Sequence, residues 1–170
     1  MHIAIIAAFN GFRDEELLQS HKIFLDNDID TEVYSSHTGM TLGKFGASFQ
    51  INKTIDQVDI NKIEALIIIG GLGVYNFLGN KKIHQLIASV HNSNKLIAAI
   101  CMAPLIIAET GLLKNRKATV FSAEKGRIIE MGASYTRAAV EYSDNIITAN
   151  NADATKKFAN KIVSHLKGKL

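Results

Sequence analysis

The hydrophobic positions of the chain follow two alternating patterns. Unbroken apolar runs of strand length occupy 2–8, 65–69 and 95–100, which is typical of parallel strands that are buried on both faces. Between these runs, apolar residues recur at helical spacing, as they do in 83–90. The pattern therefore predicts buried strands that alternate with amphipathic helices.

The remaining segments continue this alternation. Further strands are expected at 31–35, 118–121 and 145–149, and helices at 14–27, 103–110, 123–131 and 153–166. Gly43 and Gly46 lie between apolar residues within 39–51, which predicts a small hairpin there.

Strands that alternate with helices in this way form parallel units with right-handed crossovers. The expected fold class is α/β: a flavodoxin-like three-layer sandwich with a central, mostly parallel sheet, helices on both faces and a small β-hairpin. No linker or repeat divides the sequence, so residues 1–170 are expected to form a single domain. Ligands of such sheets bind beyond the carboxyl ends of the strands, where 10–13, 70–71, Cys101 and 121–122 should converge.

Composition and charge exclude several classes of protein. Apolar residues make up 47% of the chain, and 19 basic and 16 acidic side chains give a net charge of +3 without a concentrated basic stripe, so no nucleic-acid partner is expected. No apolar stretch approaches the ~20 residues that span a bilayer, and one cysteine without a leader pattern predicts a cytoplasmic protein. No histidine spacing suggests a metal site, and 70–73 lacks the full phosphate-binding pattern, so no metal or cofactor is expected.

Cys101 is the candidate nucleophile. It follows a buried strand and precedes a helix opened by Pro104, with the small residues Ala99 and Ala103 two positions away on either side. This arrangement is typical of a nucleophile elbow, in which the helix N-terminus should lower the thiol pKa from about 8.5. A buried structural cysteine fits the same local pattern, so the residues around Cys101 leave both interpretations open.

Four segments together resemble one family. A-A-I-C-M-A-P around Cys101, G-F-R-D-E-E-L at 11–17, T-L-G-K-F-G at 41–46 and I-I-I-G-G-L-G-V-Y-N at 67–76 are similar to the ThiJ/PfpI superfamily. This superfamily has a class I glutamine amidotransferase-like fold and includes the Parkinson-disease-associated deglycase and PfpI-type intracellular proteases. The resemblance covers nearly the whole chain and implies a homodimer with Cys101 as its functional thiol.

The resemblance also assigns partners to the thiol. Glu16 matches the family's acidic residue on the first helix, which hydrogen-bonds the cysteine and stays protonated when the sulfur is a thiolate. The alternative for Glu16 is a solvated carboxylate at a helix start. Gly71 and Met102 match positions whose backbone N–H groups form an oxyanion hole.

The sequence departs from the family at three pocket positions. Met102 replaces the histidine that follows the cysteine in PfpI-type members, and Phe121 occupies the position of the deglycase-branch histidine. Asn150 lies in a segment, 148–153, that replaces a Gly-Pro loop of that branch. Gly70 either lines the pocket or serves only as a turn glycine.

These features favour a cysteine-dependent stress-response enzyme that acts on small reactive carbonyls, glyoxalase-like or deglycase-like, through Cys101 and Glu16. The alternative is a redox sensor or stress-protective protein in which an oxidant converts Cys101 to a sulfinate. Without either histidine, peptidase or amidase activity is the poorest enzymatic interpretation. The natural substrate and the dimer interface cannot be derived from the sequence.

Overall fold

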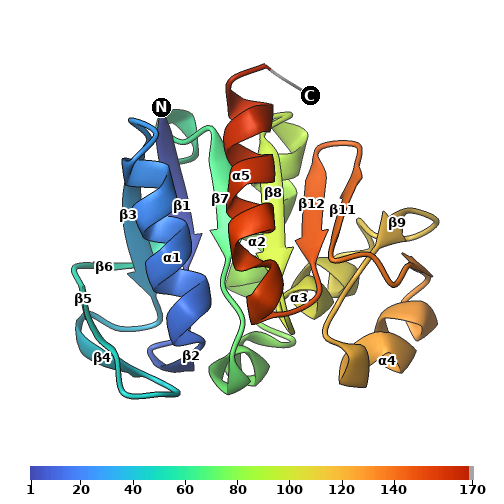
Figure 1. Ribbon diagram of the computed structural model, residues 1–170, viewed down its shortest axis with the longest axis horizontal. Helices are drawn as coiled ribbons and strands as arrows, with labels where there is room; N and C mark the ends of the chain where they lie inside the picture. Colours follow the sequence, from blue (N-terminus) through green and yellow to red (C-terminus); the bar gives the residue numbers. More distant parts are fainter. Residues whose placement is uncertain (169–170) are drawn as a thin grey trace.

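A seven-stranded sheet forms the centre of the protein (Figure 1). The computed structural model describes residues 1–168. The spatial order of the strands is β11 (Val140–Ser143), β12 (Ile146–Ala149), β8 (Leu96–Ile100), β7 (Ala65–Ile68), β1 (His2–Ile6), β3 (Asp30–Ser35) and β6 (Lys53–Thr54). All neighbouring strands are parallel except β11, which pairs antiparallel with β12.

The apolar runs predicted as strands form the middle of this sheet. Every residue of β7 and β8 is buried, because helices cover both faces of the sheet. The register places Ile67 beside Ile5 on one side and Ala98 on the other. The first strand ends at Ile6, two residues before its apolar run does, and 7–8 continue as buried connecting chain.

Helices lie on both faces of the sheet. On one face, α1 (Asp14–Leu25) and α5 (Thr155–Leu166) pack side by side, and α2 (Lys81–Asn92) lies behind the sheet beside α3 (Pro104–Glu109) (Figure 1). The short helix α4 (Lys125–Glu130) lies beyond the β11 edge. The predicted α/β fold with a mainly parallel sheet is confirmed. Among the helices of residues 1–168, none has both the length and the apolar character that crossing a bilayer requires.

The predicted hairpin is present and belongs to a separate small sheet. Its strands β4 (Gly39–Gly43) and β5 (Ser48–Ile51) are antiparallel, and β2 (Asn10–Phe12) pairs parallel with β4. Asp14 holds the hairpin turn against α1, since its carboxylate accepts hydrogen bonds from the backbone N–H groups of Phe45 (2.9 Å) and Ala47 (2.8 Å). The three residues of β2 carry no apolar run, so this strand was not predicted.

The strand predicted at 118–121 is wrong in extent and place. Only Lys117–Ala118 (β9) is extended, and it pairs with β10 (Ser134–Tyr135) outside the central sheet. The chain remains attached to the sheet by a side chain, because Thr148 Oγ1 accepts the Thr119 N–H at 2.9 Å.

Short 3₁₀ segments account for the later starts of two helices, whereas the helix predicted at 14–27 ends early, at Leu25, and the strands β6, β10 and β11 were not predicted. The predicted helices at 123–131 and 153–166 each open with a 3₁₀ segment, so α4 and α5 begin later than expected. The segments are η1 (Ile55–Gln57), η2 (Ile60–Lys62), η3 (Leu72–Phe77), η4 (Ser122–Glu124) and η5 (Ala152–Ala154).

Candidate active site

Cys101 lies on a sharp turn between β8 and α3. Its φ angle is 63°, a left-handed conformation that is uncommon for a residue with a Cβ. Backbone hydrogen bonds hold it there: its N–H donates to Ala149 O (2.9 Å) and its carbonyl oxygen accepts the Phe121 N–H (2.8 Å). Ala99 and Ala103 on either side are fully buried. The predicted elbow geometry is therefore present.

Glu16 projects from the first turn of α1 into the protein interior. Its side chain has no exposed surface, and its Oε2 accepts the Gly70 N–H at 2.9 Å. The two residues adjoin so closely that a Cβ on Gly70 would lie 2.8 Å from Oε2. The alternative of a solvated helix-start carboxylate is thus excluded for Glu16. Its neighbour Glu15 is the more exposed carboxylate and pairs with Arg13 at 2.8 Å.

Burial makes Glu16 a weak acid. Removal from water is the largest effect and raises its pKa to about 7, while the Gly70 N–H, the Cys101 thiol and the Arg13 charge act in the opposite direction. The thiol lies against this carboxyl group, yet Oε1 is buried and accepts no hydrogen bond of normal geometry from any described residue. One carboxyl oxygen therefore remains free to receive a proton beside the sulfur.

The thiol of Cys101 does not have the low pKa that the elbow pattern predicts. Burial and then the adjacent Glu16 carboxylate raise its pKa to about 12, although N–H groups of Met102 and Gly71 oppose the shift. The pKa is raised, and not lowered as the elbow pattern predicts, because the residue is only 7% exposed and lies beside a carboxyl group that opposes ionisation of the sulfur.

Two backbone N–H groups point at the sulfur. They belong to Gly71 and Met102, and both lower the thiol pKa. Within residues 1–168, neither N–H is paired with a backbone oxygen. Gly71 has a φ of 106°, and a Cβ there would lie 2.4 Å from Gly11 O, so only glycine fits this close approach. The structure thus brings both predicted oxyanion-hole residues to the thiol.

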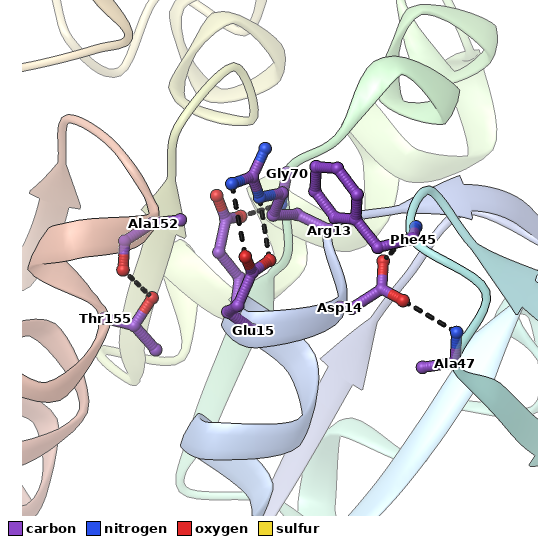
Figure 2. Close-up of polar contacts among 9 residues, drawn as sticks. Arg13, Asp14, Glu15, Phe45, Ala47, Gly70, Ala152 and Thr155 are labelled. Atoms are coloured by element: carbon purple, nitrogen blue, oxygen red, sulfur yellow. Dashed lines mark hydrogen bonds and ion pairs between the residues drawn. The ribbon is translucent and has the colours of Figure 1, made fainter.

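Cys101 and the buried Glu16 border a small pocket of about 190 Å³. Its other lining residues are Arg13, Phe121, Asn151, Ala152 and Asp153. The wall at η5 is fixed by Thr155, whose hydroxyl donates to Ala152 O at 2.6 Å (Figure 2).

The predicted pocket residues occupy three different places. Phe121 lines the pocket, and Gly70 lies behind it, between Cys101 and Glu16. Asn150 is displaced from the prediction: Asn151 takes the pocket position, and Asn150 lines a neighbouring hollow. Asn150 is the first residue after β12, which ends at Ala149. A difference of one position along the chain therefore determines that Asn151, and not Asn150, lines the Cys101 pocket.

Arg13 is a pocket residue that the sequence interpretation missed. Its guanidinium is held by Glu15, through Nε at 2.8 Å and Nη2 at 3.3 Å, and by the ring of Phe45, whose centroid lies 4.5 Å away (Figure 2). Its backbone N–H donates to Gly70 O at 3.0 Å. The signal available in the sequence was its position in the same motif as Glu16.

Comparisons with known proteins show the family and the fold of the chain. The DJ-1/PfpI family model matches residues 1–165. An uncharacterized protein of Methanocaldococcus jannaschii is 32% identical over 164 residues, covering 95% of this chain and 80% of that protein. Deglycase PfpI of Pyrococcus furiosus is 25% identical, covering 98% of this chain and 100% of that enzyme. The structure of a ThiJ/PfpI domain protein from Brachyspira murdochii has a TM-score of 0.96 at 28% identity, covering 98% of this chain and 96% of that one.

Proposed function

Because the chain belongs to the DJ-1/PfpI family, we propose that it is a cysteine-dependent enzyme of small reactive carbonyls, with a glyoxalase-like or deglycase-like activity. Several distant relatives are named deglycases. The observation that carries the proposal is the placement of Glu16, with a pKa of about 7, against the Cys101 thiol. A buried group with this pKa is a suitable general acid and base at neutral pH.

The first chemical step is addition of the thiol to an aldehyde. As Sγ of Cys101 bonds to the aldehyde carbon of an α-oxoaldehyde such as methylglyoxal, the thiol proton passes to the Glu16 carboxylate. The N–H groups of Gly71 and Met102 stabilise the oxygen that gains negative charge. Proton transfer in the same step avoids a free thiolate, which the raised pKa of Cys101 disfavours. Glu16 then gives that proton to the alkoxide oxygen, and the product is a neutral hemithioacetal.

The second step moves a proton within the bound intermediate. Glu16, ionised again, removes the hydrogen on the former aldehyde carbon, and the electron pair left behind forms an enediolate whose negative charge lies on the former ketone oxygen. Glu16 then returns the proton to the former ketone carbon, while the hydroxyl proton on the sulfur-bearing carbon moves to the former ketone oxygen, which gives a thioester of a hydroxy acid. Water hydrolyses this thioester and releases the thiol, so methylglyoxal and one water become lactate. Each proton exchanged with a carbon atom thus passes through the same carboxyl group.

This role of Glu16 compensates for the histidines that the family pattern leads one to expect. Met102 and Phe121 occupy those positions, and neither side chain accepts a proton. A peptidase would need a base that accepts the proton of the nucleophile and then, as an acid, protonates the amine leaving group. Isomerisation of an α-oxoaldehyde has no such leaving group, and the site therefore supports it better than peptide hydrolysis.

Oxidation of Cys101 is the second candidate function. It requires thiolate character and access to the oxidant. A side chain that is 7% exposed, with a pKa raised to about 12, meets neither requirement well. Low exposure and a raised pKa are instead compatible with a thiol that loses its proton only as it attacks a bound carbonyl.

The test is consumption of methylglyoxal by the purified, reduced protein, with lactate measured as product. Cys101→Ala and Glu16→Gln are expected to abolish turnover, whereas Asp26→Asn, which alters an exposed carboxylate paired with Lys22, should retain it. Equal inactivity of all four proteins would reject the proposal. If, in addition, intact-mass analysis at low peroxide showed uptake of two oxygens by Cys101 alone, the redox function would replace it.

A further inference from the structure

A second hollow adjoins the Cys101 pocket. Its volume is about 550 Å³, and it is lined by Ser122, Lys125, Ile129, Tyr135, Arg137 and Asn150. The proposed reaction does not use any of these residues.

The two cavities share their walls at two points of the chain. At the first point, Phe121 lines the Cys101 pocket and the next residue, Ser122, lines the hollow; at the second, Asn151 lines the pocket and Asn150 the hollow. Phe121 is 36% exposed. The two cavities are therefore neighbours on either side of these two stretches of chain.

The hollow differs from the pocket in charge. Lys125 and Arg137 line the hollow, no acidic residue lines it, and neither cation forms an ion pair with any described residue. The Cys101 pocket instead contains charges of both signs: the carboxyl groups of Glu16 and Asp153, and the guanidinium of Arg13, which is already paired with Glu15. An anionic group is thus attracted more strongly to the hollow than to the pocket.

The backbone around the hollow is held in place. The segment that carries Arg137 is tied on both sides, since the Thr136 N–H donates to Ala118 O (2.8 Å) and Ala139 O accepts the Asn150 N–H (3.1 Å). These contacts fix the position of the backbone that carries Arg137 relative to Cys101.

We propose that the hollow is an anion-binding subsite for the tail of the substrate. The inference rests on the proposed carbonyl activity and names its substrate class: α-oxoaldehydes that carry a carboxylate a few carbons from the dicarbonyl group. The dicarbonyl end occupies the Cys101 pocket, the linking carbons pass Phe121, and the carboxylate binds beside Lys125 and Arg137. The reaction is unchanged, with one water added per hydroxy acid formed.

The test compares 4,5-dioxovalerate, an α-oxoaldehyde with a carboxylate tail, with its methyl ester, which lacks the charge. We expect kcat/KM to be about tenfold higher for the acid, the size of two partly exposed charge contacts, and the difference to lie in KM. In Lys125→Gln/Arg137→Gln the preference should disappear while turnover of the ester is retained. The control Lys81→Gln/Lys114→Gln removes two exposed cations elsewhere and should keep the preference.

A binding measurement separates this inference from the proposed function. Levulinate has the same carboxylate tail and a ketone but no aldehyde, so it binds without reacting. Its dissociation constant for the Cys101→Ala protein should rise about tenfold when Lys125 and Arg137 are also replaced by glutamine. Turnover of acid and ester at equal rates, or levulinate binding that is absent or insensitive to those replacements, would overturn the subsite. Absence of all turnover with sensitive levulinate binding would instead reject the carbonyl activity and leave the subsite standing.

Discussion

Gly70 donates its backbone N–H to Oε2 of Glu16 at 2.9 Å, although 54 positions separate the two residues in sequence. The contact brings the first turn of α1 to the end of β7. It also leaves no room for a side chain, because a Cβ on Gly70 would lie 2.7 Å from Cβ of Cys101 and 2.8 Å from Oε2 of Glu16. A methyl group at position 70 would therefore push the Glu16 carboxyl group and the Cys101 side chain out of their present positions.

Gly70→Ala should abolish carbonyl turnover and lower the free energy of unfolding by about 1–3 kcal/mol, because the added methyl group overpacks the site. Gly126→Ala is the matched control: nothing lies within 4 Å of its added Cβ. Alanine in this helical position should raise stability by up to about 1 kcal/mol. Urea unfolding and methylglyoxal turnover measure both effects, and an active Gly70→Ala protein would contradict the proposed geometry.

Stability should fall as pH rises through the range in which Glu16 ionises. Its folded-state pKa of about 7 lies above the ordinary value of 4.5, so between these values the folded chain keeps a proton that the unfolded chain has released. The resulting stabilisation is complete below the ordinary value and is lost as pH rises through about 7. The loss in the free energy of unfolding is roughly 3 kcal/mol.

Urea unfolding at about pH 5 and about pH 8 tests this dependence. In Glu16→Gln the group cannot ionise, so most of the difference between the two conditions should vanish. An unchanged difference in that variant would assign the pH dependence to other groups.

The Glu16 carboxylate should also suppress the reactivity of the free thiol. It is the second largest cause of the raised pKa of Cys101, after burial. Alkylation by iodoacetamide should therefore have a midpoint well above the ordinary thiol value of 9.0, and Glu16→Gln should lower it. Glu15→Gln should leave it unchanged, since Glu15 is not among the causes of that shift. A wild-type midpoint below 9.0 would show a stabilised thiolate and favour the redox function.

Asp14 should contribute to stability through the hairpin turn. Its buried carboxylate accepts two backbone N–H groups, from Phe45 and Ala47. Asp14→Ala leaves both donors without their partner and should cost about 2–4 kcal/mol in the free energy of unfolding. Asp26→Ala removes an exposed carboxylate paired with Lys22 and should cost less than about 0.5 kcal/mol. Equal losses in the two variants would contradict this role of Asp14.

The parts of the fold that follow from local pattern could be predicted from the sequence. The buried runs of β7 and β8 need no information beyond their own apolar residues, and the elbow at Cys101 follows from a strand, a helix and two small neighbours. Glu16 could be assigned only through the family resemblance, because three consecutive carboxylates look alike until burial separates them.

The remainder depends on contacts between distant segments. The three residues of β2 are extended because β4 pairs with them, and the segment 119–121 is held to the central sheet by the Thr148 side chain and not by strand pairing. The pocket lining at Arg13 and Asn151 depends on where connecting chain lies in space. The pKa of Cys101 could not be predicted either, since it depends on how deeply the sulfur is buried.

The left-handed backbone at Cys101 places a limit on how this protein can evolve. A non-glycine residue at a φ of 63° is strained by about 1–2 kcal/mol relative to glycine. Mutation toward glycine would therefore relax the backbone and increase stability while it removes the sulfur. Selection for stability and selection for chemistry favour different residues here, and a lineage that lost the need for the reaction would be free to lose the cysteine first.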